Sequence, residues 1–171
     1  MKRILKEIEQ ALNSELYLLA LQSCATLPDI CGALMSEDGL ATSHAYKMWY
    51  DEYAQKCLNC FLLAEDCYLF RNSILHQAKT VPSPRGNQTA TYSRIIFTLQ
   101  ERKIIFHNNI IDGVLNLDLV IFCKGMIEAT EKWIENMENT KNINYLKNRT
   151  NVVHYYSTGL EPYIMGIPLI T

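Results

Sequence analysis

The chain has 171 residues, of which 49% are hydrophobic, and its 16 basic and 18 acidic side chains leave a formal net charge of −2. This length and composition predict one globular domain with a sizeable core. The near-neutral charge excludes a general electrostatic attraction to nucleic acid or membrane, so any anion site must be local.

We find no targeting signal and no cofactor-binding motif in the sequence. The amino-terminal residues are charged at helical spacing, unlike a signal peptide, and we see no apolar run near the roughly 18 residues of a membrane span. We therefore expect a cytoplasmic protein with no membrane partner, whose six cysteines stay reduced.

The first quarter of the chain predicts amphipathic helices. Apolar residues recur every three or four positions from Ile4 to Ala20, which indicates one long helix over about residues 2–22. Pro28 and Asp29 suit the first turn of a short helix over residues 27–34.

A third helix is expected after a cap at Thr42 or Ser43. It carries aromatic residues at helical spacing: Tyr46, Trp49, Tyr50 and Tyr53. Such a stripe favours packing in the core, and base stacking is the alternative.

A fourth helix carries the candidate site. The spacing of Leu63, Cys67, Phe70 and Ile74 forms an apolar stripe that should face the core. At about 100° per residue, Glu65, Asn72 and His76 fall within roughly 40° of one another on the opposite face. Arg71 lies about 140° round the helix from His76.

The second half of the chain predicts a change of architecture. Two prolines and a glycine make residues 79–91 a loop. Two β-branched and aromatic runs, 94–99 and 103–107, indicate a β-hairpin, and residues 108–113 read as turn material. A second long helix follows from Asp118 to about Met137, and the apolar tail should form a short strand and a packed, irregular end.

We expect a mainly α fold of the α+β class in a single domain, residues 1–171. It consists of a helical bundle over 1–78, the loop over 79–91, and the hairpin, long helix and packed tail over 92–171.

The cysteines leave two interpretations open. Cys57 and Cys60 have the two-residue gap of a zinc or redox pair, but no second pair is present at similar spacing. Buried apolar cysteine is the simpler interpretation. We therefore expect no metal and no cofactor.

The candidate helix resembles a known family. Arg71 and Asn72, followed by His76, are similar to the signature of the HEPN superfamily of helical RNases. The same Arg-to-His spacing occurs at Arg102 and at Arg149, but only Arg71 is followed by asparagine on a predicted helix. The wider phrases LPDICG, EDCY and HQ also resemble a bacterial protein family of unknown activity.

The HEPN resemblance covers about the first 80 residues and implies a helical bundle with metal-independent endoribonuclease activity. In such a reaction the ribose 2′-hydroxyl attacks the adjacent phosphate and leaves a 2′,3′-cyclic phosphate. The resemblance assigns His76 as general acid or base, Arg71 as the phosphate ligand and Asn72 as an orienting group, and Glu65 could tune His76. RNA is the implied partner, and an antitoxin or another partner protein is left open.

Two alternatives remain. The chain can be a noncatalytic helical interaction or RNA-binding protein, in which Arg71 pairs with Asp29 or Asp66 and His76 interacts with the helix end. The angle between Arg71 and His76 also suggests a homodimer, in which each subunit's Arg71 approaches the other's His76 and Leu69 provides apolar contact. A monomer in which Arg71 bends round alone is the competing arrangement.

Overall fold

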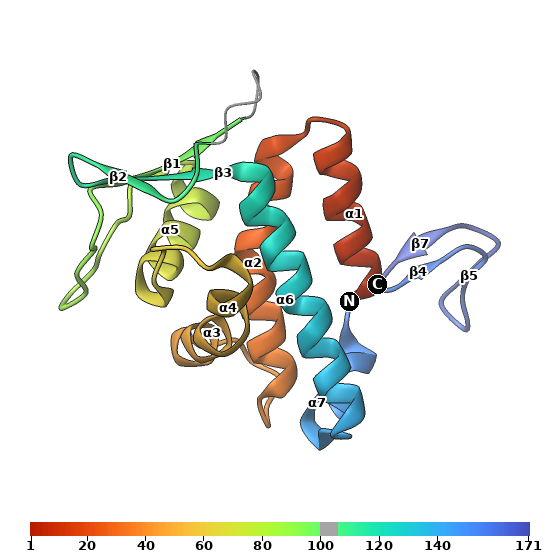
Figure 1. Ribbon diagram of the computed structural model, residues 1–171. Helices are drawn as coiled ribbons and strands as arrows, with labels where there is room; N and C mark the ends of the chain where they lie inside the picture. Colours follow the sequence, from red (N-terminus) through yellow and green to blue (C-terminus); the bar gives the residue numbers. More distant parts are fainter. Residues whose placement is uncertain (100–105) are drawn as a thin grey trace.

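Two long helices, α2 (Tyr17–Met35) and α6 (Leu119–Asn139), form the centre of the computed structural model, which describes residues 1–99 and 106–171 (Figure 1). Other helices pack around them, a small sheet lies at one end, and a C-terminal arm projects to the side. The other helical elements are α1 (Lys2–Asn13), α3 (Ser43–Trp49), the π-helical turn η1 (Tyr50–Ala54), α4 (Gln55–Leu58), α5 (Ala64–Gln77), α7 (Ile143–Asn148) and the 3₁₀ turn η2 (Arg149–Asn151). The strands are β1 (Arg94–Thr98), β2 (Asn109–Ile111), β3 (Val114–Asp118), β4 (Tyr155–Tyr156), β5 (Gly159–Leu160), β6 (Ile164–Met165) and β7 (Leu169–Ile170). The α+β class predicted from the sequence is confirmed.

Helix α2 is apolar on most of its surface because α1, α3, α5, α6 and α7 all pack against it. It is long and apolar enough to cross a membrane by length and composition, contrary to the sequence-based expectation. However, 56% of its most apolar window is buried within this structure, where it serves as the central core helix.

The predicted single helix over residues 2–22 is wrong. Helix α1 ends at Asn13, Glu15 adopts a left-handed φ of 58°, and the chain reverses into α2. The apolar spacing continues through this reversal because both helices bury a face in the same core. Leu16 and Leu19, which were expected in the core, are 51% and 56% exposed at the corner. The short helix predicted over residues 27–34 is the second half of α2, with Pro28 inside it.

The predicted aromatic helix is confirmed from its cap onward. The Thr42 side chain accepts a hydrogen bond from the Ala45 backbone N–H at 3.1 Å. Tyr46, Trp49 and Tyr50 are almost completely buried, so the stripe belongs to the core.

The sheet differs from the predicted hairpin. Strand β1 lies where expected, but it pairs in parallel with β3, and β3 pairs antiparallel with β2. Of the predicted second strand, residues 103–105 lie outside the described residues, and 106–107 are not in a strand. The actual hairpin joins β2 to β3 through Asp112 and Gly113, whose φ values of 50° and 73° match a type I′ turn.

Helix α6 begins as predicted. The Asp118 side chain accepts a hydrogen bond from the Ile121 N–H at 2.8 Å and caps the helix. One face of α6 then runs through the core, with Phe122, Met126 and Trp133 buried. The second half of the chain therefore completes the core of the first half.

The tail is not packed as expected. Residues 154–171 form two short antiparallel pairs, β4 with β7 and β5 with β6, and none of these residues is buried. By contrast, five of the six cysteines are buried and Cys57 is partly buried, which confirms their interpretation as apolar core residues.

Candidate functional site

Helix α5 presents the candidate side chains. Cys67, Phe70 and Ile74 are buried against the core as predicted, whereas Leu63 precedes the helix and is 51% exposed. The helix ends where Ala78 adopts a left-handed φ of 52° and the Lys79 N–H donates to the Ser73 carbonyl at 3.2 Å. This ending directs the chain back along the helix.

The loop after α5 folds against the helix as far as its first turn. The Thr91 N–H donates to Asp66 Oδ1 at 2.7 Å, and Gln88 Nε2 donates to Glu65 Oε1 at 3.3 Å. Asp66 is buried, so its bond to the loop is shielded from water. The returning loop therefore forms a wall beside the polar face of α5.

A small polar cavity of about 230 Å³ lies between this wall and the helix. Asn72 and His76 line it from the helix, and Arg85 and Gln88 line it from the loop, together with Tyr68, Gln77 and Ser83. The Arg85 N–H donates to Gln88 Oε1 at 3.1 Å, which holds this part of the loop in a turn. Among the described residues that line the cavity there is a guanidinium and an imidazole but no carboxylate.

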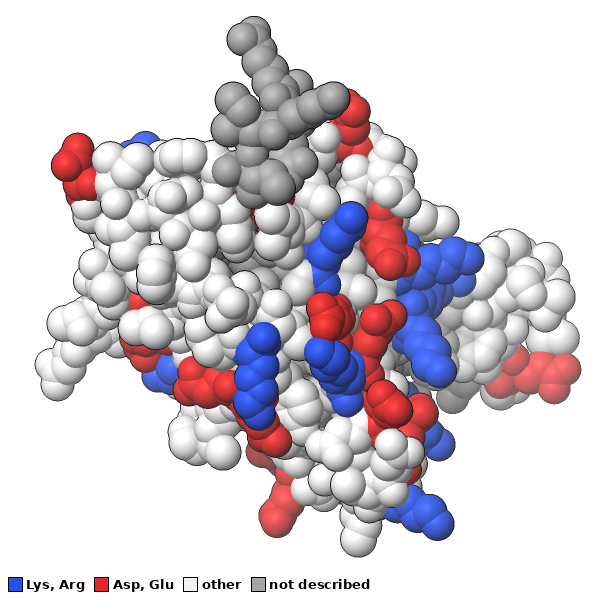
Figure 2. All heavy atoms as spheres, viewed as in Figure 1, with Lys and Arg blue, Asp and Glu red and all other residues white. Residues whose placement is uncertain are grey.

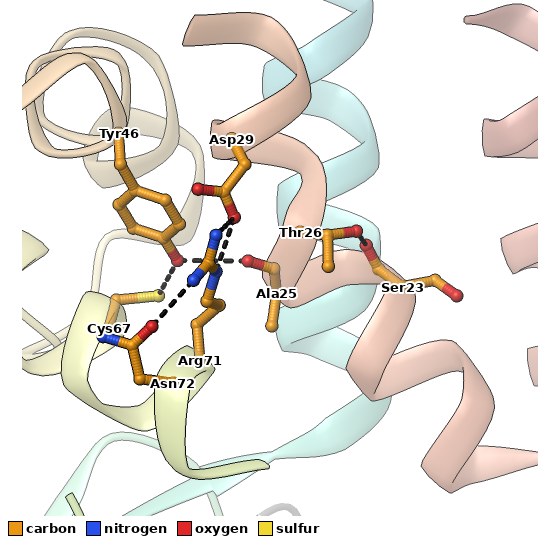
Figure 3. A network of polar contacts seen from close by, with 8 residues as sticks. All are labelled: Ser23, Ala25, Thr26, Asp29, Tyr46, Cys67, Arg71 and Asn72. Atoms are coloured by element: carbon orange, nitrogen blue, oxygen red, sulfur yellow. Dashed lines mark hydrogen bonds and ion pairs between the residues drawn. The ribbon is translucent and has the colours of Figure 1, made fainter. Parts of the chain in front are cut away.

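Arg71 reaches from α5 to Asp29 on α2 and does not line this cavity (Figure 3). Its Nε and Nη2 contact Asp29 Oδ2, and its Nη1 donates to Asn72 Oδ1 at 2.7 Å. Its guanidinium also lies 5.6 Å from the ring centre of Tyr68. Arg71 thus links α5 to α2 and fixes the amide of Asn72, whose NH₂ group remains for a further bond.

The ion pair lies in a mostly dry environment. The side chains of Arg71 and Asp29 are 19% and 12% exposed. Burial raises the pKa of the Asp29 carboxyl, and Arg71 offsets part of that shift. Nearby, burial raises the pKa of the Tyr46 hydroxyl and raises that of the Cys67 thiol to about 12, so both stay protonated. The Tyr46 hydroxyl lies 3.2 Å from the Ala25 carbonyl and 3.3 Å from Cys67 Sγ.

Glu65 stands at the rim of the site. Its Oε2 is 2.7 Å from Lys47 Nζ on α3, and its Oε1 accepts the bond from Gln88. Glu65 therefore acts on the cavity through Gln88 and not through a bond to His76.

The structure brings some of the predicted residues together and separates others. Asn72 and His76 share the cavity, as their common helical face indicated. Arg71 pairs with Asp29, as the noncatalytic alternative anticipated. The partner of Arg71 lies in its own chain, which removes the geometric reason for a cross-subunit pair, and Leu69 is fully buried rather than available for a dimer contact.

Sequence reasoning missed Arg85, Gln88 and Tyr68. Arg85 follows Pro82 and Pro84 in the loop directly after α5. An arginine in a loop stiffened by two prolines, next to the candidate helix, was the signal that could have identified it. Of the other two Arg-to-His pairs, Arg102 lies outside the described residues. Arg149 and His154 line a separate cavity of about 620 Å³ at the base of the C-terminal arm.

Comparison of the chain with models of protein families, with curated proteins and with solved structures finds no match. The function is therefore inferred from the side chains of the site.

Proposed function

We propose that this protein is a HEPN-like, RNA-binding endoribonuclease that works without a metal ion and holds one phosphodiester in the cavity between α5 and the loop. The observation that carries the proposal is the lining of that cavity, which includes Arg85 and His76 together with neutral amides and no described carboxylate. A guanidinium and an imidazole suit a phosphate group, whereas a carboxylate in the lining would repel it.

The chemistry assigns roles that differ in part from those implied by the sequence motif. The ribose 2′-hydroxyl forms a bond to phosphorus, the bond from phosphorus to the 5′-oxygen breaks, and His76 accepts the 2′ proton. Water or the protonated His76 returns a proton to the departing 5′-oxygen. Arg85 holds the phosphate oxygens, and the free NH₂ group of Asn72 donates to one of them.

Arg71 is a positioning residue in this scheme. Its bond to Asn72 Oδ1 sets which end of the amide faces the cavity, and its pair with Asp29 keeps the guanidinium in place. The helical first 77 residues, with five α-helices of unequal length, support the HEPN-like part of the proposal.

The test is cleavage of total RNA by purified protein in a chelator, with detection of 2′,3′-cyclic phosphate ends. Replacing His76 with Ala should lower the rate by about 10²–10⁴-fold. His44→Ala is the matched control, because His44 is exposed on α3 and does not line the cavity. Equal rates for both variants would contradict the role of His76.

A noncatalytic RNA-binding or interaction protein is the second candidate, and the ion pair of Arg71 with Asp29 favours it. The arginine of the family-like motif has a structural role here, so the motif alone does not assemble a catalytic pair. Arg85→Gln separates the candidates when it is compared with Arg94→Gln, an exposed arginine on β1. Loss of RNA binding in Arg85→Gln alone, with no cleavage by the unmodified protein, would support binding without catalysis.

A further inference from the structure

The C-terminal arm, residues 154–171, exposes many large apolar side chains and buries none of its residues. Seven large hydrophobic side chains of the arm and its root are well exposed, whereas Tyr156, Leu160 and Leu169 are partly buried. The exposed ones are Val153 59%, Tyr155 44%, Tyr163 81%, Ile164 48%, Met165 60%, Ile167 62% and Ile170 67%. Two-stranded sheets of this kind are marginally stable in water without a further packing partner. A covering partner would supply that packing.

The exposed area is large enough for a specific interface. Side chains of this size, about half to four-fifths exposed, each offer on the order of 100 Å² of surface, or roughly 700 Å² together. The largest apolar patch of a typical monomer is about 300–600 Å², and a standard interface buries about 800 Å² per partner.

The charge of the arm indicates the nature of that partner. Glu161 is the only Asp, Glu, Lys or Arg among residues 154–171. Figure 2 shows the arm as a largely uncharged lobe at the right, in contrast to the mixed charges over α1 and α6. At the root of the arm, Arg3 lies 4.4 Å from the ring centre of Tyr155. The arm itself carries no Lys or Arg, and such a surface suits an apolar protein face.

A matching apolar face lies on the chain itself, at the corner where α1 meets α2. Leu16, Leu18 and Leu19 are 51%, 56% and 56% exposed there. The arm leaves the body beside the first turn of α1, since residues from Met1 to Arg3 and from Val152 to Tyr156 line one cavity. The leucine corner therefore lies at the other end of α1 from the arm (Figure 1).

This placement suits reciprocal contacts across a twofold axis. When two copies of α1 run antiparallel, the arm of each copy lies next to the leucine corner of the other. Helix α1 spans about 18 Å, and the roughly eight residues from the root to the tip of the arm extend at most about 26 Å. The exposed residues of α1 are basic at the start, with Lys2, Arg3 and Lys6, and acidic later, with Glu7 and Glu9. Arg3 already pairs with Glu7 within the helix at 2.8 Å. Antiparallel helices therefore place Lys2 and Lys6 of one copy opposite Glu9 of the other.

We propose that two copies of the chain form a twofold dimer in which the C-terminal arm of each covers the leucine corner of its partner. Together, the arm and the leucine corner offer roughly 1,000 Å² of exposed apolar surface per copy, enough to contain a standard interface of about 800 Å² per partner. Neither surface includes a residue that lines the cavity beside α5, so the dimer does not rest on the proposed endoribonuclease site.

Sedimentation velocity at micromolar concentration tests the dimer with three variants. Ile167→Asp in the arm and Leu19→Asp in the corner should each raise the dimer dissociation constant by about tenfold or more. Ile143→Asp is the matched control, because Ile143 is an isoleucine 81% exposed on α7 and belongs to neither surface. Circular dichroism checks that each variant remains folded. A monomeric unmodified chain, a control that dissociates equally, or a corner variant that stays dimeric would each overturn the proposal.

Cross-linking between chains provides a second measurement that tolerates a poorly folding aspartate variant. Chains with Ile167→Cys and chains with Leu19→Cys, both with Cys57→Ser, are mixed and mildly oxidised. The proposal expects a disulfide-linked dimer from this mixture and not from Ile167→Cys mixed with Ile143→Cys. Equal linkage in the two mixtures would reject contact between the arm and the leucine corner.

Discussion

Replacing Arg71 with Met should destabilise the protein in a pH-dependent way. Methionine keeps most of the apolar stem of the side chain but removes the guanidinium, so Asp29 loses its ion pair while it remains 12% exposed. Removing one partner of a buried pair costs about 3–5 kcal/mol. Because Asp29 retains some contact with water, we expect the unfolding free energy to fall by about 3 kcal/mol near neutral pH.

The pH dependence follows from the raised pKa of Asp29. A carboxyl with a higher pKa in the folded than in the unfolded chain binds its proton more tightly when folded. Its contribution to stability is therefore largest below the unfolded pKa and is lost as the pH rises through the folded pKa. Loss of Arg71 raises the folded pKa further, so the difference between the variant and the unmodified protein should shrink toward acid pH and grow toward neutrality.

Urea unfolding followed by circular dichroism measures this difference at acidic and neutral pH. The neutral-pH loss of about 3 kcal/mol corresponds to a fall in Tm of roughly 6–12 °C for a chain of this length. Adding Asp29→Asn to Arg71→Met is the control, because the double variant buries no unpaired charge and should recover part of the stability. A loss below about 1 kcal/mol at neutral pH, or an equal loss at both pH values, would refute the role of the ion pair.

Three further substitutions test the packing around the site and core. Asp66→Ala should release the loop from α5 and weaken RNA binding as much as Arg85→Gln does; unchanged binding would show that the loop holds its position without this bond. Gly125→Ala should lower the unfolding free energy by about 1 kcal/mol, because the clash of the added Cβ with buried Leu58, 2.7 Å from its Cδ2, outweighs the roughly 1 kcal/mol that alanine gains in helix propensity; chemical denaturation with an unchanged midpoint would contradict this packing. Asp118→Ala removes the cap of α6 and should lower stability by about 1–2 kcal/mol, whereas Asp118→Asn should recover most of that loss if capping is the cause.

The sequence by itself determined the features that depend on near neighbours. Thr42 and Asp118 each precede a helix, and their side chains accept hydrogen bonds from N–H groups of its first turn. The helical period placed Asn72 and His76 on one face of α5. These signals act over four residues or fewer, so local spacing was enough to read them.

Tertiary structure decided the features that depend on distant residues. The chain reverses at Glu15, which lets α2 pack against α1 as well as against α6. The apolar spacing is the same before and after this reversal, so the spacing alone did not reveal it. Strand β1 pairs with β3 across a gap in sequence that no hairpin signal encodes. The sequence offered more than one carboxylate as a partner for Arg71, and the packing of α5 on α2 selected Asp29. The reason is that a buried charge is stable only when its partner lies in the same dry environment.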